Sequence, residues 1–122
     1  MTPIWAKQML GTDVRAKTGE MLGTIEDFVF DSTLTHVRYA LLSSGDFLGL
    51  GGHLFPVPLQ SLKLDTENEC FVLNVDNQRL RDGPSFKKAD GVHTNDSAYR
   101  DEVFEYYGID ARAWDRNARA SV

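Results

Sequence analysis

Three acidic residues lie close together in the sequence, at Glu26, Asp27 and Asp31. Carboxylates at this spacing can bind a cation, or act as a general acid and a general base. The same residue types are also common in turns and β-bulges, where aspartate accepts hydrogen bonds from nearby backbone N–H groups. We therefore expect a structural role for these acids and keep an ion-binding or acid/base role as the alternative.

A glycine-rich segment, Gly45 to Gly52, has the composition of a phosphate-binding loop. A Walker loop ends in Gly-Lys-Ser/Thr, so that the lysine and the hydroxyl reach phosphate and magnesium. Here His53 follows Gly52, and Pro56 and Pro58 oppose the helix that must follow a dinucleotide-binding loop. The segment is therefore expected to form a sharp corner between two strands.

The histidines and the cysteine give no pattern typical of a metal site. His36, His53 and His93 are far apart, and no two have the i, i+4 or short-loop spacing of metal ligands. Cys70 is the only cysteine, and no candidate base stands beside it to form a reactive thiolate. A lone cysteine also rules out a disulfide within the chain, which fits a reducing compartment. We expect no catalytic residue, no metal and no cofactor.

Aromatic residues gather near the C-terminus, where five of them lie between positions 99 and 114. The candidate interface residues in this segment are Tyr99, Val103, Phe104, Tyr106, Tyr107 and Trp114. Four of the six recur on one face of a helix predicted over 97–107. One helical face can bury only some of these side chains, and aromatic residues are enriched at interface hot spots. We give equal weight to packing on the chain's own sheet and to contact with a partner.

The elements that position these residues follow from the hydrophobic pattern. Apolar segments of strand length, separated by turn residues at close and regular spacing, predict an all-β barrel or sandwich. The predicted strands cover residues 9–16, 21–30, 37–42, 54–57 and 70–75, and the apolar pattern continues through 59–64. In the strand over 37–42 one face is expected to be buried.

Two of the predicted strands carry features that bend or limit a sheet. The apolar alternation slips near Asp27, which predicts a β-bulge. Pro56 and Pro58 have no N–H to donate, so the strand over 54–57 should be short, bulged or at a sheet edge. At the N-terminus, Trp5 is large enough to hold the lead-in segment against the body of the domain.

Helices are predicted only in the last part of the chain. Asp76 can cap a single helical turn over 77–81, in which Leu80 points inward. The polar, glycine-containing segment over 85–94 is typical of a linker.

The longer C-terminal helix has a clear end signal. Gly108 stands at the position just after the helix where glycine is favoured, and Ile109 can fold back on Phe104. A second short helix is expected over 111–118, where it would carry Trp114.

Length and composition fit one soluble globular domain. The chain has 122 residues, of which 42% are hydrophobic and 25% charged. Its formal net charge of -5, with no basic cluster, argues against nucleic acid and against an anionic membrane surface as partners. No apolar run approaches the ~20 residues of a membrane span, and the N-terminus lacks the pattern of a secretory signal. We expect a cytoplasmic protein with no membrane span.

Three segments, in this order, resemble the PRC-barrel family. They are residues 19–31 (GEMLGTIEDFVFD), residues 37–53 (VRYALL leading to FLGLGGH) and residues 57–62 (VPLQSL), with LRDGP closing the match at 80–84. Members of this family include the cytoplasmic domain of the photosynthetic reaction centre H subunit and the C-terminal domain of the ribosome maturation factor RimM. This chain has neither the membrane helix of the first nor the preceding RNA-processing domain of the second, so neither role is expected here.

The resemblance implies a mainly β fold, a small PRC-type β-barrel of about six strands, and an interaction module without shared catalytic residues. Residues 1–84 would form the barrel with its lead-in, and residues 85–122 a linker and a helical tail packed on the barrel or on a partner. We therefore expect a non-catalytic interaction or assembly module. The large apolar surface of the tail further predicts a homodimer whose stability depends on the tail.

The alternative is a small-molecule or ion-binding domain, or a weak enzyme, that uses the Gly45–Gly52 loop with Asp27 and Asp31. A concave pocket with converging polar groups would favour this alternative. A broad exposed apolar patch would favour the interaction module.

Overall fold

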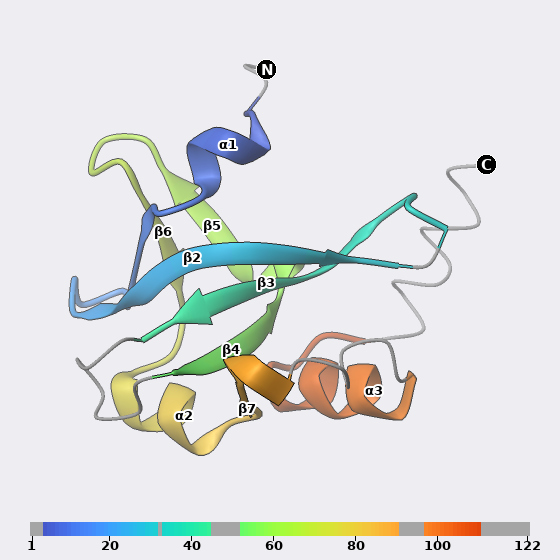
Figure 1. Ribbon diagram of the computed structural model, residues 1–122. Helices are drawn as coiled ribbons and strands as arrows, with labels where there is room; N and C mark the ends of the chain where they lie inside the picture. The colour runs from blue at the N-terminus through green and yellow to red at the C-terminus, as the bar shows by residue number, and fades with distance from the viewer. Residues whose placement is uncertain (1–3, 32, 45–51, 91–96, 111–122) are drawn as a thin grey trace.

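The computed structural model describes residues 4–31, 33–44, 52–90 and 97–110. The strands are β1 (Asp13–Arg15), β2 (Met21–Phe30), β3 (Val37–Ser43), β4 (His53–Pro58), β5 (Leu62–Asp65), β6 (Cys70–Leu73) and β7 (Phe86–Lys87). The helices are α1 (Ala6–Met9), α2 (Asn77–Asp82) and α3 (Ser97–Tyr106), with 3-10 turns η2 (Leu59–Ser61) and η3 (Lys88–Asp90). The fold is therefore mainly β with a C-terminal helix, as predicted (Figure 1).

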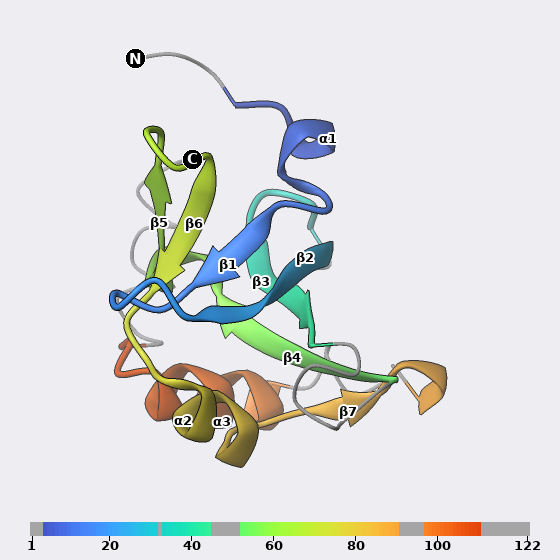
Figure 2. The same cartoon turned by 90° about the vertical axis from the view of Figure 1, so that its left-hand side faces the viewer.

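All seven strands belong to one curved sheet in the order β5-β6-β1-β2-β3-β4-β7. The β1–β6 pair is parallel and the other neighbours are antiparallel. In Figure 2, α1 lies at the upper end of the sheet, whereas α2 and α3 lie at the lower end, below β4.

The prediction of a closed barrel of about six strands is wrong in both respects. Among the described residues, β5 and β7 stand at the two ends of the strand order and do not pair with each other. The chain between β6 and β7 forms α2, and its Leu80 is fully buried in the main core. A helix, rather than another strand pair, therefore fills this side of the core.

The bends predicted for the sheet are present. The register between β2 and β3 shifts between Ile25 and Asp27, as expected for a bulge. Along β4, β7 pairs with His53 and Leu54, so within the described part of the chain the segment that holds Pro56 and Pro58 has β3 as its only strand neighbour. Proline is tolerated there because no second strand needs its missing N–H.

The main core lies on the concave side of the sheet and collects side chains from most strands. Its buried members are Val14, Ala16, Leu22, Ile25, Ala40, Leu42, Phe55, Val57, Phe71, Leu73 and Leu80. A second core covers the opposite face of β3 and β4, where Tyr39, Leu41 and Leu54 pack against Val103 and Phe104 of α3. Both faces of β3 are therefore buried, whereas the sequence predicted one.

The helix ends form as predicted from local signals. The Asp76 side chain accepts a hydrogen bond from the Arg79 N–H at 2.8 Å and caps α2. At the end of α3, Gly108 has a φ of 72°, and the Ile109 N–H donates to the Phe104 carbonyl at 2.8 Å. This is the Schellman arrangement, in which a left-handed glycine lets the chain turn back.

Two predictions for irregular segments are wrong. The first strand was expected to begin at residue 9, but α1 occupies the lead-in and leaves Trp5 69% exposed rather than held against the domain. The segment predicted as a linker contains β7, which adds to the sheet at β4. A two-residue strand leaves no periodic pattern in the sequence, so it could not be predicted.

Candidate functional site

The aromatic residues of α3 differ in how far they are buried. Val103 and Phe104 are fully buried, whereas Tyr99, Tyr106 and Tyr107 are half-buried. The Tyr39 ring of β3 lies edge-on to both Tyr99 and Phe104, with ring centroids 6.4 and 6.2 Å apart. Trp114 and the helix predicted over 111–118 lie outside the described residues.

The phenol groups of Tyr39, Tyr99 and Tyr107 stay neutral near pH 7. Burial, and to a smaller extent the charge of nearby Glu102, together raise the pKa of Tyr99 to about 12. Burial also raises the pKa of Tyr39 and of Tyr107 above the ordinary value of tyrosine. These hydroxyls can therefore donate or accept a hydrogen bond, but they are poor general bases at neutral pH.

Helices α2 and α3 are joined by one reciprocal contact. The Arg79 guanidinium donates to the Tyr106 carbonyl at 2.7 Å, and the Tyr106 hydroxyl donates to the Arg79 carbonyl at 2.6 Å. The guanidinium carbon also lies 3.8 Å from the centre of the Tyr106 ring, a cation–π geometry. Gly83 leaves room for this ring, because a Cβ there would lie 2.7 Å from it.

The acids of β2 each have a separate local partner. Asp27 accepts the N–H of Phe28 at 2.8 Å, and Glu26 forms an ion pair with Lys88 at 3.1 Å. Along an extended strand, positions 27 and 31 stand about 13 Å apart. No group of three or more His, Cys, Asp or Glu side chains in the described part of the chain is placed to hold a metal ion.

Asp31 organises the turn between β2 and β3. Its carboxylate accepts hydrogen bonds from the Thr33 hydroxyl at 2.8 Å and from the Thr35 N–H and hydroxyl at 3.1 Å. Burial alone would raise the pKa of Asp31, but these bonds and one from the His36 backbone together lower it. The acid therefore has the turn-forming role that its residue type favours.

The remaining sequence candidates are dispersed. His36 Nδ1 lies 3.6 Å from an Asp31 carboxylate oxygen, and His53 begins β4. Cys70 is a buried free thiol in β6. Gly52 is the last residue of the glycine-rich loop, and its carbonyl accepts a hydrogen bond from the Lys88 N–H at 2.8 Å. Residues 45–51 and His93 lie outside the described residues.

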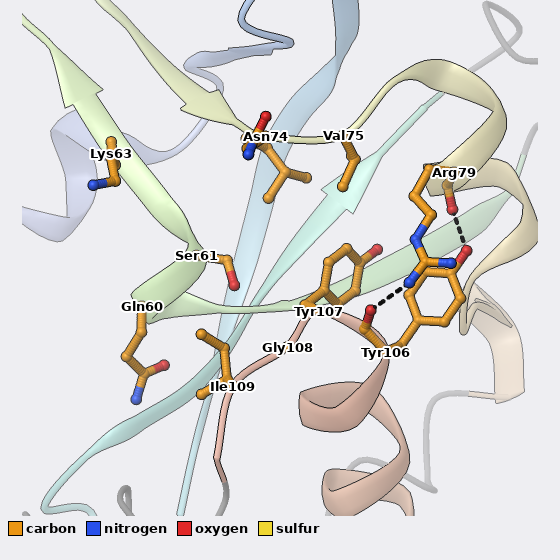
Figure 3. A pocket seen from close by; sticks show the side chains of 11 residues that line it. Gln60, Ser61, Lys63, Asn74, Val75, Arg79, Tyr106, Tyr107, Gly108 and Ile109 are labelled. Carbon is orange, nitrogen blue, oxygen red and sulfur yellow. Dashed lines mark hydrogen bonds between the residues drawn. The ribbon is translucent and has the colours of Figure 1, made fainter.

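A pocket of about 430 Å³ opens where α2, the end of α3, β5 and the end of β6 meet (Figure 3). We call it the junction pocket. Its lining comprises Gln60, Ser61, Lys63, Leu73, Asn74, Val75, Arg79, Tyr106, Tyr107, Gly108 and Ile109. These residues come from four separate segments, and none of them forms a motif in the sequence, so the pocket could not be predicted from it.

Large apolar side chains are exposed at the opposite end of the molecule. Ile4, Trp5 and Leu64 are 48%, 69% and 45% exposed, and we call them the N-terminal face. Ile4 and Leu64 line a groove of about 290 Å³ whose floor includes Met9 and Phe71. Leu64 belongs to β5, whose only strand partner among the described residues is β6.

No helix in the described part of the chain is long and apolar enough to cross a membrane. Comparison with curated proteins gave no match. A family model described as the PRC-barrel domain matches residues 4–80, from the lead-in to the middle of α2, and leaves β7 and α3 outside the match. This match covers more than half of the chain and agrees with the segments that resemble the family. The chain therefore belongs to the PRC-barrel family.

Proposed function

We propose that this protein is a non-catalytic interaction and assembly module that forms a homodimer through its N-terminal face. The observation that supports the proposal is the exposure of Ile4, Trp5 and Leu64, of which Ile4 and Leu64 line one groove. Full burial of a large apolar side chain stabilises a protein or a complex by ~1.5–3 kcal/mol. Burying these exposed side chains in a dimer interface would therefore stabilise the dimer. An apolar patch is also self-complementary, as a two-fold dimer requires.

The adjoining edge of the sheet adds a second reason. Strand β5 has an unpaired side within the described part of the chain, and Leu64 lies on this strand. An unpaired edge offers backbone N–H and C=O groups to a partner. A partner that covers the groove can therefore gain both apolar contact and backbone hydrogen bonds.

The C-terminal residues remain a second proposed interface. In this structure the second core already uses Val103 and Phe104, so Tyr106, Trp114 and the exposed parts of Tyr99 and Tyr107 would have to carry such a contact. The family and the separate partners of the β2 acids favour the absence of catalysis. The division into a barrel of residues 1–84 and a tail of residues 85–122 also stays a proposal.

We expect the intact protein to sediment as a dimer at micromolar concentration. Replacing Leu64 with glutamate should raise the dimer dissociation constant at least about tenfold, because it places a charge in an apolar contact. The matched control is Leu34→Glu, since Leu34 is 76% exposed but lies in the turn between β2 and β3. Sedimentation velocity over a concentration series measures both variants.

Three results would contradict the proposed surface. A monomer at all concentrations up to the millimolar range would remove the dimer. A dimer that is lost in Trp114→Ser but retained in Leu64→Glu would move the interface to the C-terminal residues. Equal effects of Leu64→Glu and Leu34→Glu would show that charge in general, and not the N-terminal face, controls association.

A further inference from the structure

The junction pocket has a positive lining in an acidic protein. The formal net charge of the chain is -5, yet Lys63 and Arg79 both line the pocket, and none of its described lining residues is acidic. Neither cation forms a salt bridge within the described ranges. Other described lysines and arginines also lack a salt bridge, but here two cations share one pocket whose described lining contains no acid, and this arrangement favours an anionic ligand.

Two hydroxyl groups in the same pocket have no hydrogen-bond partner in the protein. The Ser61 and Tyr107 side-chain oxygens are both buried, and no described group lies within bonding distance of either. Other buried side-chain atoms of the described residues also lack a partner, but only Ser61 and Tyr107 among them line this pocket, and such atoms call for an explanation. Because both oxygens have almost no accessible surface, a ligand oxygen reaches them only after a small side-chain movement, and it then provides the missing acceptor.

Figure 3 shows how these groups are arranged. Tyr107 and Ser61 lie in the middle of the view, with Lys63 to one side and Arg79 to the other. The reciprocal contact with Tyr106 fixes the position of Arg79 but engages its guanidinium in a single hydrogen bond within the described residues. Since a guanidinium carries five N–H donors, others remain for an anion.

The rest of the lining combines the polar side chains of Gln60 and Asn74 with apolar surface, and this mixture sets the kind of molecule that fits. Leu73, Val75 and Ile109 supply aliphatic surface beside the Tyr107 ring. Ligand pockets are typically about 300–1,000 Å³ and combine apolar walls with a few polar groups that fix orientation. At about 430 Å³ the junction pocket falls at the small end of this range.

We propose that the junction pocket binds a small organic anion, a carboxylate or a phosphate ester with a compact apolar or aromatic body. The anionic oxygens accept hydrogen bonds from Ser61 and Tyr107, and Lys63 and Arg79 supply opposite charge. The apolar body lies against Val75 and Ile109. Tyr107 remains a donor at neutral pH, because burial raises the pKa of its phenol. This site is separate from the N-terminal face and does not depend on dimerisation.

The test is a titration of the intact, isotopically labelled chain with phenyl phosphate and with benzoate, followed by the backbone amide NMR signals. Benzyl alcohol, which has the same aromatic body and no charge, is the control ligand. We expect saturable shifts for residues 61, 74 and 107–109 with one or both anions and no saturable shifts with benzyl alcohol. Binding of phenyl phosphate but not benzoate, or the reverse, identifies which anion the pocket accepts.

Variants of the pocket provide the second arm. Tyr107→Phe removes only the hydroxyl and should weaken binding about tenfold, as expected for a hydrogen bond to a charged group. Lys63→Gln should weaken binding about 2–5-fold, and Lys87→Gln, an exposed lysine of β7 outside the pocket, should leave it unchanged. Absence of saturable shifts, equal binding of benzyl alcohol, or unchanged affinity in both pocket variants would overturn the proposal.

Discussion

Replacing Phe104 with alanine is expected to lower the free energy of unfolding by about 3–5 kcal/mol, the usual cost of removing a buried phenylalanine. The side chain is fully buried between α3 and the outer face of β3 and β4, where it contacts Tyr39, Leu41 and Leu54. Its loss leaves a cavity between α3 and the sheet. Helix α3 should therefore be part of one cooperative unit with the sheet.

Urea denaturation followed by far-UV circular dichroism measures this effect. Trp5 is 69% exposed and would report poorly on the core, so fluorescence is the weaker probe. The control is Glu105→Ala on the exposed side of the same helix, where we expect a change within about 0.5 kcal/mol. A loss below about 1 kcal/mol for Phe104→Ala would mean that residues 85–122 behave as a separate tail.

Replacing Gly23 with alanine is expected to lower the free energy of unfolding by about 1–3 kcal/mol. A Cβ at this position would lie 2.6 Å from the Ser43 carbonyl oxygen of the neighbouring strand β3. Since that atom belongs to the backbone of a paired strand, it cannot move aside as a flexible side chain does. The close approach of β2 and β3 thus requires glycine at position 23.

The sign of the change in the free energy of unfolding distinguishes two effects of Gly23→Ala. By conformational entropy alone, glycine to alanine in a strand should stabilise the protein by about 0.5–1 kcal/mol. Thr24→Ala, at the next residue of β2, serves as the control and should change stability by less than about 1 kcal/mol. A stabilised Gly23→Ala variant would show that β2 and β3 are farther apart at this point than the structure has them.

Features that depend on a few neighbouring residues could be predicted from the sequence. The cap at Asp76, the inward Leu80 and the turn at Gly108 each follow from residues within one helical turn, and the structure confirms them. The bulge near Asp27 was visible because it disrupts a period of two. These signals are local, so tertiary contacts do not override them.

Features that depend on contacts between distant segments could not be predicted from the sequence. Leu41 and Leu42 are both buried, because α3 covers one face of β3 and the main core the other. The sequence showed apolar residues on both faces but not what would cover them. The contact between Arg79 and Tyr106 joins residues 27 positions apart, and no rule of sequence spacing predicts such a contact.

The candidate functional residues likewise divide into those that could be predicted from neighbouring residues and those that could not. Asp27 and Asp31 were correctly favoured as turn and bulge residues, since each carboxylate accepts hydrogen bonds from nearby groups. The exposure of Trp5 was not foreseen, because size alone does not determine where a side chain packs. Exposed apolar surface becomes visible only once the rest of the chain has been placed.

Hydrogen–deuterium exchange on the intact protein at low and at high concentration tests the N-terminal face most directly. If this face forms the dimer, raising the concentration should slow exchange in residues 4–10 and 62–65 and leave residues 97–109 unchanged. If exchange is the same at both concentrations, or slows only in residues 97–109, the N-terminal face is not the dimer interface.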